Sequence, residues 1–374
     1  MTKKRVTTVD IAKRLGINKS TVQNVLNPRH ANHYSEETRT KVLQIAEELG
    51  YQTSLLAYTI KQPLKQIGFV GSGAAHSENV FVREILRGMQ LSAENESYML
   101  MTSESSIVSA GTNKDDLMEQ WTKRTNKFVE LVSSKILDGL IIDKSQFGNP
   151  QMELLEKAGV PFVLVNGQIP NASNQLHQRM FWVSIDHFQG GQLAVEHLLG
   201  YGHKRIAIIM PGISHFPAGK RPSMLSDRLK GYISALKSAD IEYDPSMVSE
   251  CSLEDKTSVL RAIDKLMRLD LPPTALFACD DCIAVLTINY LRERGIQVPR
   301  EISVIGYGNL SLCQYMAVPK LTTIDVPWGK MGEISISTLA AILNDPKRVK
   351  ELLHFNILKT KIFEGASVSA PLKN

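Results

Sequence analysis

The sequence predicts a small all-α head with a helix-turn-helix, followed by an α/β body of two doubly wound parallel-sheet lobes. The chain has 374 residues, whereas a single hydrophobic core rarely grows beyond roughly 250 to 300 residues. Its first 61 residues carry all of the net positive charge and place their apolar residues at helical spacing. From Gln66 onward, short β-rich runs alternate with helical stretches, a pattern typical of parallel sheets covered on both faces.

The composition is that of an ordinary globular protein. Hydrophobic residues make up 43% and charged residues 22% of the chain, which excludes general disorder, collagen and coiled-coil rods. No apolar run approaches the roughly 18 residues that suggest a membrane span. The basic stretch Met1–Asp10 is followed by amphipathic sequence and not by the apolar block of a signal peptide. We therefore expect a cytoplasmic protein with no membrane partner.

The positive charge is confined to the amino-terminal part of the chain. Residues 1–61 contain ten lysines and arginines against five aspartates and glutamates, and the rest of the chain contains equal numbers of the two kinds. A small basic module on a neutral body indicates a polyanionic partner for that module.

The head has the pattern of two short helices separated by a glycine turn. Apolar residues recur at helical spacing before and after Gly16, and glycine ends a helix in the left-handed conformation without a Cβ clash. Thr7 followed by Asp10 predicts the cap of the first helix, and Asn18 that of the second. This pattern favours a DNA-binding helix-turn-helix over a generic helical hairpin. A third helix over 35–49 would complete a small core.

The outward face of the second helix is rich in groups that read base edges. A glutamine or asparagine amide can make two hydrogen bonds to adenine, and lysine suits guanine or a phosphate. Polar residues in the loop after this helix would contact phosphates or simply be solvated. The predicted DNA-contacting residues of the head are Thr7, Lys19, Ser20, Thr21, Gln23, Asn24, Asn27 and Arg29.

The body contains enough strands for two sheets. Nine candidates over roughly 300 residues indicate two parallel sheets and not one. They lie at 67–70, 98–102, 139–143, 162–166, 182–186, 205–210, 275–279, 302–307 and 321–325. Helices are predicted between them at 81–95, 188–199, 225–238, 253–269 and 281–294. Ligands in such folds bind beyond the carboxyl ends of the strands, so a small-molecule site is expected between the two sheets.

Nothing in the sequence argues for catalysis, a cofactor or a metal. The run Gly71–His76 resembles a dinucleotide-binding turn, but a histidine stands where close helix packing requires the third glycine. Cys279 and Cys282 form a CxxC with no further ligands nearby and with two aspartates between them. We interpret these cysteines as buried small apolar residues and expect neither a redox pair nor a zinc site.

Stretches of both the head and the body carry a family resemblance. Val6–Val22 and Ser35–Tyr51 resemble the opening of the LacI/GalR family of bacterial repressors. Glu84–Gly88, Asp138–Ile142 and His197–Ile206 resemble the periplasmic-binding-protein-like (type I) sensor domain of the same family. The resemblance implies a homodimer on a near-palindromic operator in double-stranded DNA, with a hinge helix from each subunit in the minor groove. It also implies a small-molecule effector, a sugar or sugar derivative, between the lobes.

The resemblance also divides the chain. Residues 1–51 would form the DNA-binding head and 52–65 the hinge helix and linker, from which Ala57, Ile60 and Lys61 would contact DNA. Residues 66–370 would form the effector-binding and dimerisation domain. Its first lobe is expected at about 66–186 and 321–346, and its second lobe at about 187–320 and 347–370.

Six residues match positions at which the family holds its effector: Phe81, Asn166, Arg228, Asp280, Asp281 and Trp328. A guanidinium group can hold vicinal hydroxyls or a carboxylate, and carboxylates in a cleft suit polyhydroxyl ligands. The alternatives are a surface salt bridge for Arg228 and core packing for Trp328 and Phe81.

The chain departs from the family at three places. Gln23–Asn24 stand where many relatives have Ser-Arg, so the operator bases cannot be transferred from them. Ile60 stands where relatives commonly insert a leucine between base pairs; it is still an apolar wedge, but a stiffer one. Gly308 replaces an aspartate that relatives often have. Either the effector differs, or Asn309 substitutes, or this sensor no longer binds a sugar.

Together these patterns predict a sequence-specific DNA-binding transcription regulator, a dimeric repressor of carbohydrate-utilisation genes controlled by a sugar or sugar derivative. The run Ser369–Asn374 has no heptad pattern, which favours a dimer over a tetramer. The alternatives are a regulator that answers a non-sugar effector or a partner protein, and a ligand-binding α/β protein whose basic head docks something other than DNA.

Overall fold

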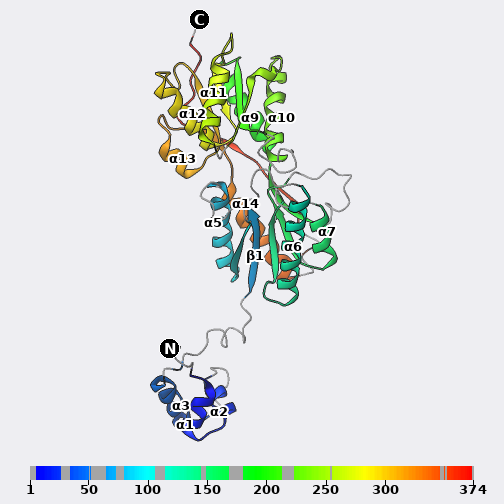
Figure 1. The fold of residues 1–374 in the computed structure, drawn as a ribbon, viewed down its shortest axis with the longest axis vertical. Coiled ribbons are helices and arrows are strands. Elements are labelled where there is room, and N and C mark those ends of the chain that lie inside the picture. The colour runs from blue at the N-terminus through cyan, green and yellow to red at the C-terminus, as the bar shows by residue number, and fades with distance from the viewer. Residues whose placement is uncertain are drawn as a thin grey trace. The chain divides into compact units, whose positions relative to one another are not determined.

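The computed structural model of the protein describes residues 6–26, 34–49, 51, 65–72, 80–105, 114–144, 149–167, 180–212, 223–252, 255–345, 349 and 352–372. The chain forms two compact units, Met1–Leu64 and Lys65–Asn374. Three helices make up the described part of the first unit, and two six-stranded sheets with their helices make up that of the second (Figure 1). The predicted all-α head and two-lobed α/β body are confirmed.

Three short helices form the head: α1 (Thr8–Leu15), α2 (Lys19–Val25) and α3 (Glu36–Glu48). Ile11, Val22 and Val42, one from each helix, are fully buried in a common apolar core. Because each helix contributes a side chain that is removed from water, the three helices are fixed against one another.

Local hydrogen bonds set the first helix of the head as the sequence predicts. The backbone N–H and the hydroxyl of Thr7 both donate to Oδ2 of Asp10, over 2.7 and 2.6 Å. Gly16 then ends α1 with a φ of 66°, in the left-handed region that favours glycine. The turn that separates α1 from α2 therefore rests on a residue type that few others can replace.

The caps of the other two head helices differ from each other. The hydroxyl oxygen of Ser35 accepts a hydrogen bond from the N–H of Thr38 and caps α3. The side chain of Asn18 makes no capping hydrogen bond, which corrects the predicted cap of α2. Only the backbone carbonyl of Asn18 accepts from Thr21 and Val22, as in any helix start.

The first lobe is a six-stranded sheet in the order β11-β5-β4-β3-β1-β2, with parallel pairing throughout. Its strands are β1 (Gln66–Ser72), β2 (Met99–Ser105), β3 (Gly139–Asp143), β4 (Phe162–Val165), β5 (Phe181–Ile185) and β11 (Phe355–Leu358). Successive side chains enter different cores, as expected for a sheet covered on both faces. Phe69 and Ile141 pack with α5 (Val80–Asn95) and α14 (Trp328–Asn344), whereas Val70 and Ile142 pack with α6 (Lys114–Ser133) and α7 (Asn149–Lys157).

The second lobe is a six-stranded sheet in the order β12-β10-β9-β8-β6-β7. Its strands are β6 (Ile206–Pro211), β7 (Val248–Cys251), β8 (Ala275–Ala278), β9 (Ser303–Gly308), β10 (Thr322–Asp325) and β12 (Lys361–Phe363). All pairs are parallel except β10 with β12. Its helices are α9 (His187–Gly200), α10 (Ser223–Ser238), α11 (Lys256–Met267), α12 (Asp281–Glu293) and the short α13 (Ser311–Met316).

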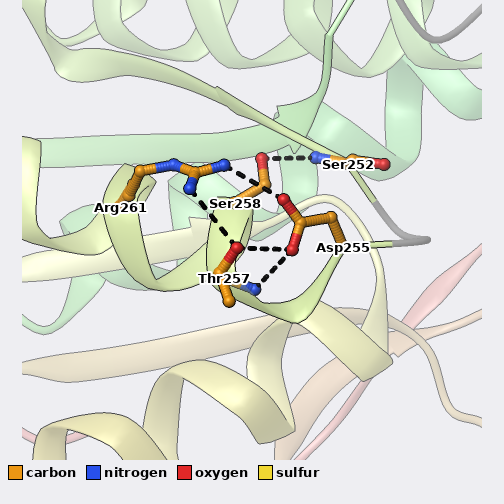
Figure 2. A network of polar contacts seen from close by, with 5 residues as sticks. All are labelled: Ser252, Asp255, Thr257, Ser258 and Arg261. Atoms are coloured by element: carbon orange, nitrogen blue, oxygen red, sulfur yellow. Dashed lines mark hydrogen bonds and ion pairs between the residues drawn. The ribbon is translucent and has the colours of Figure 1, made fainter.

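Helix α11 starts with a polar network that fixes its first turn (Figure 2). Oδ1 of Asp255 accepts from the N–H of Thr257 over 2.9 Å, and Oδ2 accepts from the guanidinium of Arg261 over 3.0 Å. The hydroxyl oxygen of Ser258 accepts from the N–H of Ser252 over 2.9 Å and ties the helix to the end of β7. The helix therefore begins at residue 256, later than the 253 predicted from apolar spacing.

The chain returns to the first lobe later than predicted. It leaves that lobe after β5, at Asp186, and β10 still pairs with β9 in the second sheet. Residues 322–325 therefore belong to the second lobe, and the passage back lies at Val326–Pro327, directly before α14. The predicted start of the returning first-lobe segment at residue 321 is therefore wrong. A resemblance in sequence does not reveal which strands pair, and β10 is a strand of only four residues.

The last passage between the lobes also lies elsewhere. β11 belongs to the first sheet and β12 to the second, so the chain crosses at Lys359–Thr360. The predicted boundary between residues 346 and 347 lies outside the described residues, but the pairing of β11 with β5 in the first sheet shows that this boundary is wrong.

Helices of the described residues are all too short or too polar to cross a membrane. Within the same residues, no three histidines, cysteines, aspartates or glutamates gather as metal ligands would. Cys279 is buried at the end of β8, and Cys282 is half-buried in the first turn of α12. This placement agrees with their interpretation as small packing residues.

Candidate DNA-reading face and effector site

Helix α2 presents the polar face that the sequence singles out. Lys19, Ser20 and Gln23 are exposed, and Thr21 is half-buried. The buried side chain of Val22 anchors the opposite side of the helix in the core of the head. An exposed polar helix face held by a three-helix core is the arrangement that reads base edges in a major groove.

Asn24 differs from the other residues of this face. Its Nδ2 donates to the hydroxyl of Tyr34 over 3.1 Å, and the side chain is half-buried. This bond ties the end of α2 to the segment that precedes α3, so one amide hydrogen of Asn24 is engaged inside the head.

Of the remaining predicted DNA contacts, only Thr7 lies within the described residues. Thr7 is exposed at the start of α1, with its hydroxyl hydrogen engaged in the cap. The other predicted contacts lie outside the described residues: Asn27, Arg29, Ala57, Ile60 and Lys61.

A series of side-chain contacts joins the two lobes. The rings of Phe81 in α5 and Trp328 in α14 have centroids 5.2 Å apart, and the Trp328 ring lies 6.2 Å from that of His187 in α9. His187 is in turn 5.9 Å from the ring of Tyr307 in β9. The guanidinium carbon of Arg228 in α10 lies 3.8 Å from the Tyr307 ring centroid. Three of the predicted effector residues thus meet in one cluster, here called the lobe-junction cluster.

Arg228 is only 5% exposed and is therefore no surface salt bridge. One of its terminal nitrogens donates to the carbonyl of Cys279, and the other lies 3.4 Å from Nδ1 of His187. Its Nε is buried and has no partner among the described residues, and no carboxylate of those residues forms an ion pair with it. A buried cation without a paired carboxylate is costly, so this guanidinium suits a ligand group.

His187 belongs to the lobe-junction cluster although it is not among the effector residues predicted from the sequence. Its Nδ1 lies 2.9 Å from the hydroxyl of Tyr307. Burial, followed by the charge of Arg228, lowers the pKa of His187 well below its ordinary value, so the ring is neutral. The available signal was its position directly after Asp186, at the predicted first crossing between lobes.

The two predicted aspartates play different parts. Asp281 is fully buried: Oδ1 accepts from the hydroxyl of Thr323 over 2.6 Å, and Oδ2 accepts from the N–H of Leu310 over 2.7 Å. Asp281 therefore holds the segment after β9, and its predicted contact with the effector stays a prediction. Oδ1 of Asp280 accepts from the N–H of Cys282 over 2.7 Å, which caps α12. Burial raises the pKa of both carboxyl groups, that of Asp281 to about 7.

Asn166 follows β4 in the left-handed region, with a φ of 57°. Its side chain is 2% exposed, and neither its oxygen nor its nitrogen has a hydrogen-bond partner in the described part of the chain. Leaving such a group unpaired costs about 1–3 kcal/mol. Strained residues with unmet polar groups occur at ligand sites, where the ligand supplies the missing partner.

Gly308 ends β9 with a φ of 136°, which other residues rarely adopt. Its carbonyl accepts from Nε1 of Trp328 over 3.2 Å. A Cβ at this position would lie 3.4 Å from Oδ2 of Asp281, so the family's aspartate would sit beside another carboxyl group. Asn309 does not substitute for it freely, because its amide donates to Asp325 and accepts from Gln314.

Two glycines fix the helices that carry the cluster. A Cβ on Gly191 would clash with the backbone of Arg228, and one on Gly88 would clash with the backbone of Gly329. The backbone of α9 therefore lies directly against that of α10, and α5 lies directly against α14. The first contact fixes the position of Arg228 in α10. The second fixes the position of Trp328, which is next to Gly329 in α14.

Known proteins match both parts of the chain. Residues 7–54 match the family of bacterial regulatory proteins called the lacI family, and residues 195–368 match the periplasmic binding protein-like domain. The HTH-type transcriptional repressor PurR of Vibrio atlanticus is 27% identical over 350 residues, which cover 92% of this chain and 94% of that protein.

Solved structures show the same fold. A LacI family transcriptional regulator from Enterococcus faecium with bound ribose has a TM-score of 0.65 and 25% identity, and the match covers 83% of this chain and 100% of that chain. The Lac repressor dimer bound to operator and the anti-inducer ONPF has a TM-score of 0.70 and 21% identity, covering 98% and 100%. This chain therefore combines a LacI-family DNA-binding domain at residues 7–54 with a periplasmic binding protein-like domain, and it is a DNA-binding regulator of transcription whose curated relatives are repressors and not enzymes.

Proposed function

We propose that the protein is a cytoplasmic, homodimeric repressor whose affinity for an operator in double-stranded DNA is controlled by a small molecule at the lobe junction. The observation that carries the proposal is the set of buried polar atoms on Asn166, His187 and Arg228 that have no hydrogen-bond partner within the described residues, in a chain with an exposed helix-turn-helix face. The first feature calls for a ligand and the second for a nucleic acid.

The head would read one half of the operator through α2. Gln23 is the side chain that suits base reading, because its exposed amide can donate and accept at an adenine edge. Lys19 at the start of the helix suits a phosphate or guanine. Asn24 would contact DNA through its amide oxygen and through the amide hydrogen that does not bond to Tyr34.

A second subunit would cover an apolar surface on and after α13. Leu312, Tyr315, Met316 and Val318 lie close together in sequence and are 49%, 87%, 55% and 61% exposed. Exposed apolar patches of this kind mark interaction surfaces. We assign the patch to a second copy of the chain, because a two-fold symmetric operator requires a two-fold symmetric dimer. The similar Lac repressor structure is also that of a dimer bound to operator.

The proposed effector is a sugar or sugar derivative. Phe81 and Trp328 offer ring faces, and Arg228 and Asn166 offer hydrogen-bonding groups to hydroxyls. The similar regulator from Enterococcus faecium contains ribose. A non-sugar effector is the second candidate, favoured by Gly308, which leaves no acceptor side chain at that position.

An effector at this junction would act on the operator by changing how the lobes are held together. Trp328 and Phe81 belong to helices of the first lobe, whereas Arg228 and His187 belong to helices of the second. A ligand that contacts both groups favours one arrangement of the lobes over others. Such coupling is typically worth about 1–3 kcal/mol in operator affinity.

Selection of bound duplexes from a random library, followed by sequencing, tests the proposal. We expect a two-fold symmetric site with half-sites about one helical turn apart. A folded protein that enriches no sequence would refute operator binding. Light scattering tests the dimer, which requires a mass of two subunits; a mass of one or four subunits would refute it.

A further inference from the structure

The protonation pattern of His187 follows from its two neighbours. Nδ1 of His187 is in contact with the hydroxyl of Tyr307 at 2.9 Å and with a terminal nitrogen of Arg228 at 3.4 Å. A guanidinium group only donates hydrogen bonds, so Nδ1 must be the acceptor in this pair. A neutral imidazole that accepts at Nδ1 carries its proton on Nε2.

Nε2 of His187 is therefore a buried N–H donor. It has no hydrogen-bond partner among the residues that the structure describes, and the side chain is 4% exposed. Nε of Arg228 is a second buried donor without a partner in the described part of the chain, and its side chain touches the same imidazole. Two unpaired donors on side chains in contact call for an acceptor between or beside them.

The charge around these donors defines the acceptor further. Arg228 is a buried cation, and no carboxylate of the described residues lies within ion-pair distance of it. Asp280 interacts with it electrostatically but forms no ion pair with it within the described residues, and burial raises the pKa of this carboxyl group. A neutral hydroxyl would satisfy the donors but leave the guanidinium without a direct ion pair, whereas an oxyanion would supply both an acceptor and an ion pair.

We propose that His187 is a specificity-determining residue that, together with Arg228, binds an oxyanion of the effector, a carboxylate or a phosphate. The inference rests on the proposed effector site and narrows its ligand from sugars in general to acidic or phosphorylated sugar derivatives. His187 supplies an uncharged N–H donor and Arg228 supplies the positive charge.

Calorimetry on the full-length protein with matched ligands tests this. The probes are glucose, glucuronate and glucose 6-phosphate, together with ribose and ribose 5-phosphate, so that each anion has a neutral partner and carboxylate is separated from phosphate. We expect at least one anionic member to bind at least about tenfold more tightly than its neutral partner, the effect of one charge-assisted hydrogen-bond pair. Equal or tighter binding of the neutral partners, or no heat with any anion, would overturn the proposal.

Two substitutions separate the donor role from packing. His187→Phe keeps a ring but loses the N–H, and should weaken binding of the anion about tenfold or more. His187→Gln keeps an N–H donor and should restore part of that affinity. Circular dichroism shows whether each variant is folded. Unchanged anion affinity in a folded His187→Phe variant would exclude His187 from recognition.

Nuclear magnetic resonance of the His187 ring nitrogens distinguishes a hydrogen-bonding role of His187 from a role in packing alone. The ¹⁵N shifts of the His187 ring should show the Nε2–H form in the free protein, and the Nε2 resonance should move when the anion binds. A proton on Nδ1 would contradict the inference. Failure here is distinct from failure of the proposed function, because selection of operator duplexes does not depend on the effector.

Discussion

Nε1 of Trp328 donates a hydrogen bond to the carbonyl of Gly308 over 3.2 Å, and this bond joins the two lobes. Trp328 begins α14, which packs on the first sheet, whereas Gly308 ends a strand of the second. The same indole contacts the ring of Phe81 and lies next to His187. A change in the arrangement of the lobes must therefore rearrange the contacts of Trp328.

Replacing Trp328 separates its hydrogen bond from its packing. Trp328→Phe removes the indole N–H but keeps an aromatic ring, so we expect the free energy of unfolding to fall by about 0.5–1.5 kcal/mol. Trp328→Ala also removes the buried ring and should cost about 3–5 kcal/mol. Urea denaturation followed by circular dichroism measures both. No loss in a folded Trp328→Phe variant would show that the bond to Gly308 contributes nothing of its own.

Asp281 makes stability depend on pH in a defined direction. Its pKa is raised to about 7 in the folded protein, against an ordinary value of 3.8. Between these values the unfolded chain has lost a proton that the folded chain retains, so the stability contributed by Asp281 falls as pH rises through this window. We expect wild type to lose stability relative to Asp281→Asn over this range, by at most about 1.4 kcal/mol per pH unit.

The asparagine variant is the matched control because it does not titrate. Its oxygen can accept from the N–H of Leu310, and the hydroxyl of Thr323 can turn to accept from its amide. Asp281→Ala leaves both donors unpaired and should be less stable than Asp281→Asn at every pH. Urea titrations at several pH values check this, and a difference between wild type and Asp281→Asn that is independent of pH would refute the assignment.

Gly16 should be essential to the head for its backbone conformation alone. A Cβ at Gly16 would meet no atom of the described residues within 4 Å, and the φ of Gly16 is 66°. Gly16→Ala should therefore destabilise the head by about 1–2 kcal/mol through the left-handed conformation, and Gly16→Asn by less. Hydrogen exchange of the α1 and α2 amides reports the loss.

Gly159 offers a control for this substitution in the other unit of the chain. It has the same φ of 66° and the same free space around a Cβ, but it lies after α7 in the first lobe. Gly159→Ala should carry the same backbone strain and leave exchange in α1 and α2 unchanged. Faster exchange in the head of that variant would mean that the effect of Gly16→Ala is not local.

Lys19 and Gln23 should affect DNA binding in different ways. Lys19→Ala removes a charge, so it should weaken binding to all duplexes and reduce the salt dependence by about one phosphate contact. Gln23→Ala should cost about 1–3 kcal/mol on the selected operator only and leave the salt dependence unchanged. Fluorescence anisotropy on operator and scrambled duplexes measures both. Identical behaviour of the two variants would refute the assignment of roles.

The parts of the fold that local chemistry determines could be predicted from the sequence. The cap of α1 and the turn at Gly16 depend on residues close together in the chain, and they form as predicted. Strands that are buried along their whole length, such as β3, can also be predicted, because burial of every residue requires a continuous apolar run in the sequence. The strands β7, β11 and β12 were missed, since they are short, partly exposed and held by pairing with neighbours that are distant in sequence.

The candidate site was predictable only as far as the family resemblance reached. Phe81, Arg228 and Trp328 come together in the lobe-junction cluster, but the resemblance gave no sign that the carboxyl group of Asp281 accepts hydrogen bonds from Thr323 and Leu310. The role of His187 could not be predicted from the sequence, because it depends on contacts with Tyr307 in β9 and Arg228 in α10. Burial and hydrogen-bond partners of this kind are properties of the tertiary structure.

The most direct test of the central claim is a titration of the full-length protein onto a selected operator duplex and onto a scrambled duplex of the same composition. It should be run at about 50 and about 200 mM salt, where phosphate contacts make affinity fall steeply. We expect the protein to bind the operator at least about 10³-fold more tightly than the scrambled duplex, and to lose affinity for both duplexes at the higher salt concentration. Equal affinity for the two duplexes would contradict it.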